Sequence, residues 1–167
     1  PGGQPRRHGK QSIYGLQLQE KQKIRLAYGI SEKQLRSVYV TAKKMDGITG
    51  TNMLVLLESR LDNVVYRMGF CVTRPQARQL VRHGHFRVND RKVDMPGVLL
   101  KPGDVVSIRE ASAEMKVLKE NLESAASVSK PAWLTFENGK GTVVRYPERA
   151  DIPNVADEQV VVEFYSK

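Results

Sequence analysis

Residues 58–109 read ESRLDNVVYRMGFCVTRPQARQLVRHGHFRVNDRKVDMPGVLLKPGDVVSIR, and this stretch decides the fold. Its apolar residues recur first with helical spacing and then in short alternating runs. The stretch therefore predicts two short helices, the second rich in arginine, that lead into a small set of strands. We find no plausible catalytic group in it. An arginine-lined helix beside a small sheet is typical of a module that binds RNA.

The second predicted helix carries three arginines on one face. It opens at Thr73–Gln76 (TRPQ), which has the pattern of an N-terminal capping box. Arg74, Arg78 and Arg82 are each four residues apart and lie within an arc of roughly 80°. Because like charges at this spacing repel, an external anion would offset the repulsion. We interpret this face as an RNA contact, and a solvated charged surface is the alternative.

Short apolar runs after this helix predict a sheet. Phe86–Val88, Arg91–Val93 and Val105–Arg109 are predicted strands, and Asn89-Asp90 suits a tight hairpin turn between the first two.

The last third of the chain predicts a helix, a hairpin and a final strand. Residues 113–125 have the pattern of a mixed-charge helix. Residues 132–136 and 142–146 flank Asn138-Gly139, a strong hairpin signal. The apolar run QVVVEFY, residues 159–165, looks like a strand. We expect it to pack against the interior, with the first helices as one candidate surface.

Three helices are predicted before the arginine helix. The first spans residues 16–28 and ends at Gly29. The second opens at Ser31–Gln34 (SEKQ), a capping box. The third runs from near Thr51 to Met68 as one continuous apolar stripe, with a glycine stop after it.

Residues 1–15 are predicted to form a basic extended arm. They contain Arg6, Arg7, His8 and Lys10 among glycines and prolines, and too few apolar side chains to build a core. The density of cations beside stackable polar groups favours an arm that lies on phosphates. A solvated tail is the alternative.

Composition and charge narrow the class of partner. The 167 residues include 27 Lys and Arg against 18 Asp and Glu, for a net charge of +9. Residues 1–50 carry 10 basic and 3 acidic side chains, whereas residues 111–167 carry 7 and 9. This asymmetry favours a polyanionic partner. No apolar run reaches the roughly 18 residues of a membrane span, and the basic segments lack the apolar face of a surface-bound helix, so we expect no membrane contact.

Several kinds of chemistry can be set aside. Cys71 is the single cysteine, which excludes an internal disulfide and a cysteine-cluster zinc site and favours a reducing compartment. No phosphate-cradling glycine motif is present, so we expect no cofactor and no small-molecule substrate. The HxH pair His83 and His85 lacks a third ligand nearby, and we predict no metal. We interpret Glu58 and Asp62 as groups that orient arginines or cap helices rather than an acid–base pair.

The stretches RLDNVVYRMGF, TRPQARQLVRHGHFRVNDRKVD and KPGDVVSIRE resemble the RNA-binding module named after small-subunit ribosomal protein S4. YGLQLQEKQKIRLAYGISEKQLR before it, and TVVRYPERADIP and EQVVVEFYSK after it, extend the resemblance to the bacterial ribosomal S4 family over essentially the whole chain.

This resemblance implies a cytoplasmic, non-enzymatic ribosomal protein. It would be a primary binder of small-subunit ribosomal RNA (rRNA), at a helix junction of the five-prime domain, and would nucleate assembly. It would contact ribosomal protein five (S5), lie near the messenger RNA (mRNA) entrance channel and contribute to translational accuracy. The alternative is an RNA-modifying enzyme or ribosome-associated stress factor with the same module.

We therefore predict an α+β fold: a helical domain, and an α/β RNA-binding domain in which a helix pair packs on a small, mainly antiparallel sheet. The expected ranges are 1–15 for the arm, 16–57 plus 160–167 for the helical domain, and 58–159 for the α/β domain, with the module core at 58–109. The candidate RNA-binding residues are Arg6, Arg7, His8, Lys10, Gln11, Tyr14, Gln17, Lys21, Lys23, Arg25, Arg60, Arg74, Gln76, Arg78, Gln79, Arg82, His83, His85 and Lys101.

Overall fold

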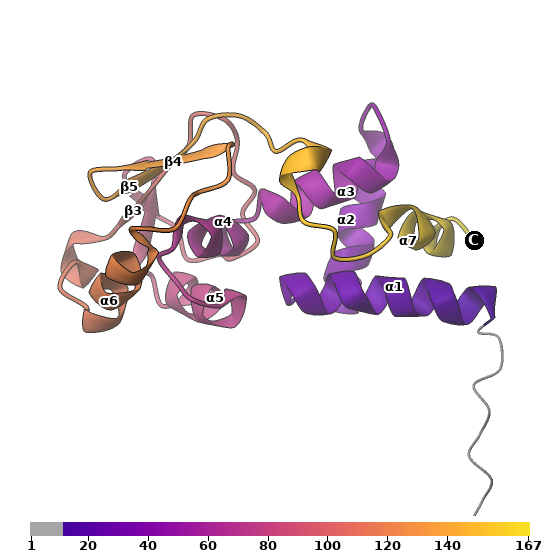
Figure 1. Ribbon diagram of the computed structural model, residues 1–167, viewed down its shortest axis with the longest axis horizontal. Coiled ribbons are helices and arrows are strands. Elements are labelled where there is room, and N and C mark those ends of the chain that lie inside the picture. Colours follow the sequence, from indigo (N-terminus) through magenta and orange to yellow (C-terminus); the bar gives the residue numbers. More distant parts are fainter. Residues whose placement is uncertain (1–11) are drawn as a thin grey trace, which may run out of the picture.

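The computed structural model describes residues 12–167, which form two bodies that lie side by side (Figure 1). The right-hand body in this view is helical, and the left-hand body combines helices with a sheet. Each has its own hydrophobic cluster. The predicted α+β class, with a helical domain beside an α/β domain, is confirmed.

Four helices build the helical body: α1 (Ile13–Tyr28), α2 (Glu32–Lys44), α3 (Thr49–Glu58) and α7 (Glu158–Tyr165). Helix α7 packs on α1 and α3, and α2 packs on α3. Ile152, in the segment that leads back from the sheet, lies in the same hydrophobic cluster.

Helix α1 begins three residues earlier than predicted. The Ser12 side chain accepts a hydrogen bond from the N–H of Gly15 at 3.0 Å and so caps the helix N-terminus. The extended arm predicted for residues 1–15 is therefore wrong for residues 13–15. The rest of the arm, residues 1–11, lies outside the described part of the chain.

The capping box predicted at Ser31 is confirmed. Its hydroxyl accepts from the N–H of Gln34 at 3.1 Å, and the Gln34 side chain accepts from the N–H of Ser31 at 2.9 Å. Two of the N–H groups that a helix start leaves unpaired are thereby satisfied.

Replacing Ser31 by alanine is expected to lower the free energy of unfolding by about 1 kcal/mol, because one capping acceptor is lost. Ser37→Ala is the matched control, since Ser37 is exposed in the middle of the same helix. Chemical denaturation of both variants measures the effect. Equal stability of the two would contradict a capping role for Ser31.

The single helix predicted from Thr51 to Met68 is wrong. Helix α3 ends at Glu58, the backbone becomes extended at Arg60, and α4 (Leu61–Met68) starts anew. The N–H groups of Leu61 and Asp62 bond to the carbonyls of Val98 and Pro96, at 2.8 and 3.0 Å, instead of to the preceding turn. Contacts with a distant loop therefore override a continuous apolar stripe.

The α/β body packs α4 and α5 (Arg74–Arg82) on one face of a five-stranded sheet. Strands β1 (Phe86–Val88), β2 (Arg91–Lys92), β3 (Val105–Ile108), β4 (Leu134–Glu137) and β5 (Lys140–Val143) lie in the order β2-β1-β3-β5-β4, and every pair is antiparallel. The Asn89-Asp90 turn joins β1 and β2 with positive φ at both residues, and the predicted hairpin at Asn138-Gly139 joins β4 and β5.

Helix α6 (Lys116–Ala125) follows a short 3-10 turn (Glu110–Ser112) and closes the core of this body. The ring of Phe70 meets those of Phe86 and Phe136 edge to face, with centroids 5.4 and 5.5 Å away. A second 3-10 turn (Arg149–Asp151) lies on the return to the helical body.

The final segment was predicted to be a strand and is a helix instead. Asp157 caps α7, because its side chain accepts from the N–H groups of Gln159 and Val160. The expected packing against the first helices is confirmed by the contacts of α7 with α1. Among residues 12–167, no helix has both the length and the apolar character needed to cross a membrane.

Candidate nucleic-acid interface

A buried polar network joins the two bodies. Glu58, at the end of α3, is 1% exposed. Its carboxylate accepts from the hydroxyl of Tyr28 at 3.0 Å and from Nη2 of Arg67 at 2.7 Å. The side-chain amide of Asn63 donates to the same carboxylate. Burial, together with the Glu58 carboxylate, raises the pKa of Tyr28, so this hydroxyl stays protonated and donates.

A second carboxylate lies on the first turn of α4. Asp62 is 1% exposed and accepts from Nε and Nη2 of Arg60, both at 3.2 Å. It also accepts from the N–H of Asn63 at 2.7 Å. Glu58 and Asp62 therefore orient arginines, as interpreted from the sequence.

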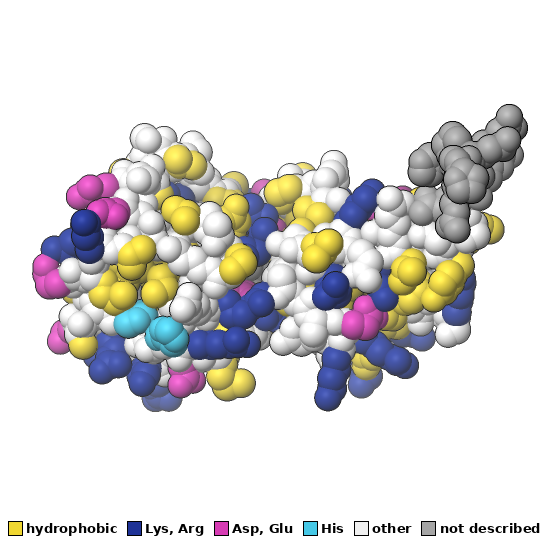
Figure 2. Space-filling model, turned by 90° about the horizontal axis from the view of Figure 1, so that it is seen from below, with side chains coloured by type: hydrophobic (Ala, Val, Ile, Leu, Met, Phe, Trp, Pro, Cys, Tyr) yellow, Lys and Arg dark blue, Asp and Glu magenta, His cyan; other side chains and the backbone are white. Residues whose placement is uncertain are grey.

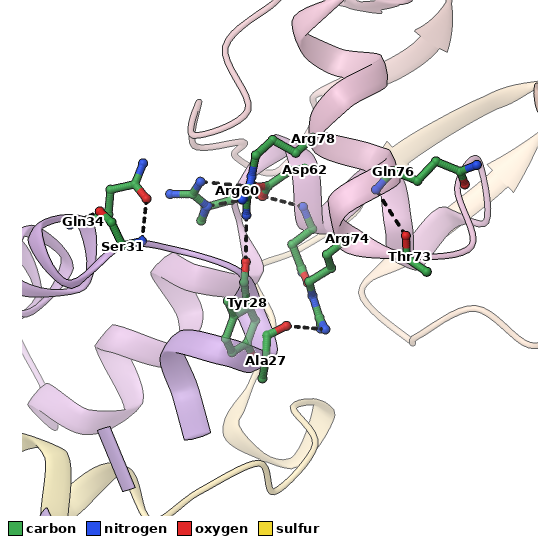
Figure 3. Close-up of polar contacts among 11 residues, drawn as sticks. Ala27, Tyr28, Ser31, Gln34, Arg60, Asp62, Thr73, Arg74, Gln76 and Arg78 are labelled. Carbon is green, nitrogen blue, oxygen red and sulfur yellow. Dashed lines mark hydrogen bonds and ion pairs between the residues drawn. The ribbon is translucent and has the colours of Figure 1, made fainter. Parts of the chain in front are cut away.

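The first two arginines of α5 reach across to the end of α1 (Figure 3). Nη1 of Arg74 donates to the carbonyl of Ala27 at 2.8 Å, and Nη2 of Arg78 donates to the carbonyl of Tyr28 at 3.3 Å. Arg78 also lies 3.7 Å from the carboxylate of Asp62. Contacts inside the chain therefore offset much of the repulsion that had suggested an external anion.

Arg82 differs from the other two arginines of this face. It is exposed and takes part in none of the ion pairs found in residues 12–167. The three arginines predicted to form a single RNA contact therefore differ: Arg74 and Arg78 lie at the junction of the bodies, and Arg82 faces solvent.

Two of the predicted RNA-binding residues in α1 are buried. Gln17 is 3% exposed and Lys21 is 6% exposed. Lys21 pairs with Glu32 at 2.8 Å and lies 4.7 Å from the ring centroid of Phe164 in α7. Both side chains pack within the helical body. A plain count of cations along α1 missed this burial.

The remaining described candidates face solvent to different degrees. Lys23 is exposed and pairs with Glu20 at 2.8 Å, and Arg25 donates to Gln22 at 2.7 Å. Arg60 is buried against Asp62. Tyr14, Gln79, His83 and Lys101 are exposed, whereas Gln76 and His85 are half-buried. Arg6, Arg7, His8, Lys10 and Gln11 lie outside the described residues.

The start of α5 confirms half of its predicted capping box. The hydroxyl of Thr73 accepts from the N–H of Gln76 at 3.2 Å. The Gln76 side chain, however, accepts from the N–H of Val72 and not from that of Thr73.

Nδ1 of His85 lies 2.7 Å from the hydroxyl of Ser112. Partial burial, and then the nearby His83 and Arg109, lower the pKa of His85.

The structure reveals a row of cations on the sheet that sequence reasoning missed. The cations Lys92, Arg87 and Lys140 lie on one face, because Lys92, Arg87, Ser107 and Lys140 occupy directly opposed positions on β2, β1, β3 and β5. Glu137 of β4 lies opposite Lys140 at the end of the row. Phe86 and the other core-facing residues lie on the opposite face. At 4.7–4.9 Å between strands, the row spans roughly 14 Å. The signal available in the sequence was the position of Arg87 between two apolar residues, Phe86 and Val88.

The exposed face of α2 is a second basic surface that was missed. Lys33, Arg36, Lys43 and Lys44 are exposed, and none takes part in an ion pair within residues 12–167. Leu35 and Tyr39 on the other side of the helix are buried. The helical period that predicted the buried face also placed these cations on the outer one.

Figure 2 shows Lys and Arg side chains on both bodies on the face seen from below, with the histidine side chains beside them on the α/β body. Exposed cations without carboxylate partners attract polyanions most strongly, because no internal pair must first be broken. Both bodies therefore present surfaces suited to phosphate.

The described residues offer little for other chemistry. Burial raises the pKa of the Cys71 thiol to about 12, so this side chain packs as a small apolar group and is a poor nucleophile. Within residues 12–167, no three His, Cys, Asp or Glu side chains are grouped so that they could hold a metal ion.

Two family models match consecutive parts of the chain. Residues 1–58 match the family model described as ribosomal protein S4/S9 N-terminal domain, and residues 59–106 match the S4 domain. The small ribosomal subunit protein uS4 of Thermodesulfovibrio yellowstonii is 50% identical over 169 residues, which cover 100% of this chain and 81% of the relative. That of Halalkalibacterium halodurans is 52% identical over 165 residues, which cover 98% of this chain and 82% of the relative. The chain therefore belongs to the uS4 family of small ribosomal subunit proteins.

Proposed function

We propose that this chain acts as a structural component of the small ribosomal subunit by binding its rRNA through both bodies. The observation that carries the proposal is the set of exposed cations without carboxylate partners, on α2 in one body and on α5 and the sheet in the other. Family membership supports the choice of rRNA over other polyanions.

The finer role follows from the same family membership and stays a proposal. We infer an early-binding protein at a helix junction of the rRNA five-prime domain, which nucleates assembly. We also infer that the chain contacts ribosomal protein S5, lies near the mRNA entrance channel and influences translational accuracy. The enzyme alternative is not retained, because the relatives that match nearly the whole chain are named as ribosomal proteins.

Filter binding tests the choice of RNA. At equal salt, the protein is expected to bind a transcript of the rRNA five-prime domain at least about tenfold more tightly than a large-subunit transcript of equal length, because specific sites exceed non-specific phosphate binding. Equal affinity for the two transcripts would contradict the proposal. Ordered addition during subunit reconstitution tests early binding separately.

Deleting residues 1–11 is expected to lower RNA affinity and to leave the melting temperature unchanged. The segment has no Val, Ile, Leu, Met, Phe, Trp or Tyr, so its removal takes nothing apolar from the core. The deletion ends before Ser12 so that the cap of α1 remains. Each arm cation that touches phosphate should contribute about 0.7–0.9 to the slope of log affinity against log salt.

The matched control keeps the chain length and replaces Arg6, Arg7 and Lys10 by glutamine. It should reproduce the loss of affinity if charge is the cause. Full affinity in both variants would show that the arm does not contribute to RNA binding.

A further inference from the structure

The contacts between α5 and α1 suggest that two arginines have a role other than binding phosphate. Ala27 and Tyr28 lie in the last turn of α1, where helix carbonyls lack partners within the helix and carry partial negative charge. Arg74 and Arg78 donate to these two carbonyls from the other body. Two guanidinium groups thus stabilise the C-terminal end of a helix in a separate body.

Arg74 is also anchored on its own side of the junction. Nε of Arg74 donates to the side-chain oxygen of Asn63 at 2.9 Å. Its guanidinium carbon lies 4.8 and 4.7 Å from the ring centroids of Tyr28 and Tyr66. Contacts from both bodies therefore determine its orientation.

Arg78 lies tightly against the turn that follows α1. Gly29 has a φ of +66°, and a Cβ there would lie 2.7 Å from Nη2 of Arg78. Only 23% of the Arg78 side chain is exposed, and Asp62 flanks it. Neither arginine presents a free guanidinium to a ligand in this arrangement.

We propose that Arg74 and Arg78 are positioning residues that hold the two bodies in one orientation, so that their basic surfaces bind one RNA together. This inference rests on the proposed function. The chain crosses between the bodies at residues 58–61 and again between Val143 and Ile152. Two covalent crossings limit the relative motion, and the arginine contacts remove much of what remains.

The energetic reason is pre-organisation. Two surfaces held at a matched spacing bind one ligand more tightly than two surfaces free to reorient, because orientational freedom is lost before binding instead of during it. Loss of the two arginines should therefore weaken binding without removing phosphate contacts. The salt slope counts phosphate contacts, so it separates positioning from direct contact.

The experiment compares two variants with equal loss of charge. The junction variant is Arg74→Gln with Arg78→Gln. The matched control is Arg82→Gln with Arg87→Gln, which removes the exposed cation of α5 and the half-buried cation of the sheet row. Affinity for a five-prime-domain rRNA transcript is measured as a function of salt. Thermal melting and circular dichroism verify folding.

The junction variant is expected to lose at least about fivefold in affinity at every salt concentration, with an unchanged slope. The control should lose slope instead, by up to about 0.9 for each cation removed. A junction variant with a slope lower by nearly two would show that Arg74 and Arg78 bind phosphate, and would overturn the inference.

A second measurement is independent of RNA. Nitroxide labels at Lys43→Cys and Lys116→Cys, exposed positions on different bodies, report the distance between them in a Cys71→Ala background. The junction variant should broaden the distance distribution. The single variant Arg78→Lys should give a narrower distribution than the single variant Arg78→Gln. An unchanged distribution would overturn the inference. If the parent protein fails to bind rRNA, the proposed function fails, and this measurement still tests positioning.

If the double variant does not fold, Arg78→Gln alone takes its place in both measurements, because the contacts of Arg74 with Asn63 and Ala27 then remain. It should show the same pattern at smaller amplitude. A loss of slope in the single variant, or a distance distribution identical to that of the parent, would overturn the inference equally.

Discussion

Replacing Asp62 by alanine is expected to lower the free energy of unfolding by about 3–5 kcal/mol, because it leaves a buried guanidinium without its counter-charge. Asp62 is 1% exposed, and its partner Arg60 is 7% exposed. The substitution also removes the acceptor for the N–H of Asn63 and the carboxylate near Arg78. The cost arises mainly from the stranded Arg60, whose guanidinium lies close to Gly97 in the loop before Leu99.

Urea denaturation of the Asp62→Ala protein and of a matched control measures this loss. Glu120→Ala is the matched control, since Glu120 also belongs to an ion pair, with Lys116, but both side chains are exposed. Its effect should stay below about 1 kcal/mol. The double variant Arg60→Met with Asp62→Ala should recover part of the stability, because it no longer buries a charge. An Asp62→Ala protein as stable as the control would contradict a structural role for the buried pair.

The sequence predicted correctly those elements that are stabilised by residues close to one another in the chain. Ser31 and Gln34 satisfy each other's backbone N–H groups within one turn, so the capping box could be recognised from four residues. The Asn89-Asp90 turn needs positive φ at two positions, and Asn and Asp tolerate that conformation better than most residues. In each case the stabilising partners are neighbours in the chain.

The errors have distant causes. Nothing near Ser59 in the sequence shows that the carbonyl of Val98 will take the N–H of Leu61 and end α3. The run QVVVEFY has the β-branched composition of a strand. The Asp157 cap and an apolar surface offered by α1 and α3 nevertheless make it a helix. Tertiary contacts decided both conformations.

The candidate site shows the same division. Sequence identified the sign of the charge and the arginine face of α5, but not the partner of each side chain. Lys21 and Arg60 look like free cations in sequence and are buried against Glu32 and Asp62. Arg87 is half-buried on the sheet, and the strand register was needed to show that the exposed Lys92 lies opposite it.

The affinity for rRNA is expected to fall about a thousandfold between 50 and 200 mM monovalent salt. Exposed cations without carboxylate partners lie on α2, on α5 and on the sheet, and about six phosphate contacts from these surfaces would give a slope magnitude of roughly 5. Each contact releases counterions from the RNA, and salt opposes that release. A slope of this size over a fourfold change in salt corresponds to about 4 kcal/mol of binding free energy.

Filter binding over this salt range measures the slope, with melting of the free protein at each salt to show that the fold persists. The matched control is Lys116→Gln with Lys119→Gln, which removes two cations of α6 that already pair with Glu120 and Glu114. Its slope should equal that of the parent, because those cations make no phosphate contact in this interpretation. A parent slope near 1 would show that phosphate contributes little. An equal loss of slope in the control and in Arg82→Gln with Arg87→Gln would show that net charge matters and its placement does not.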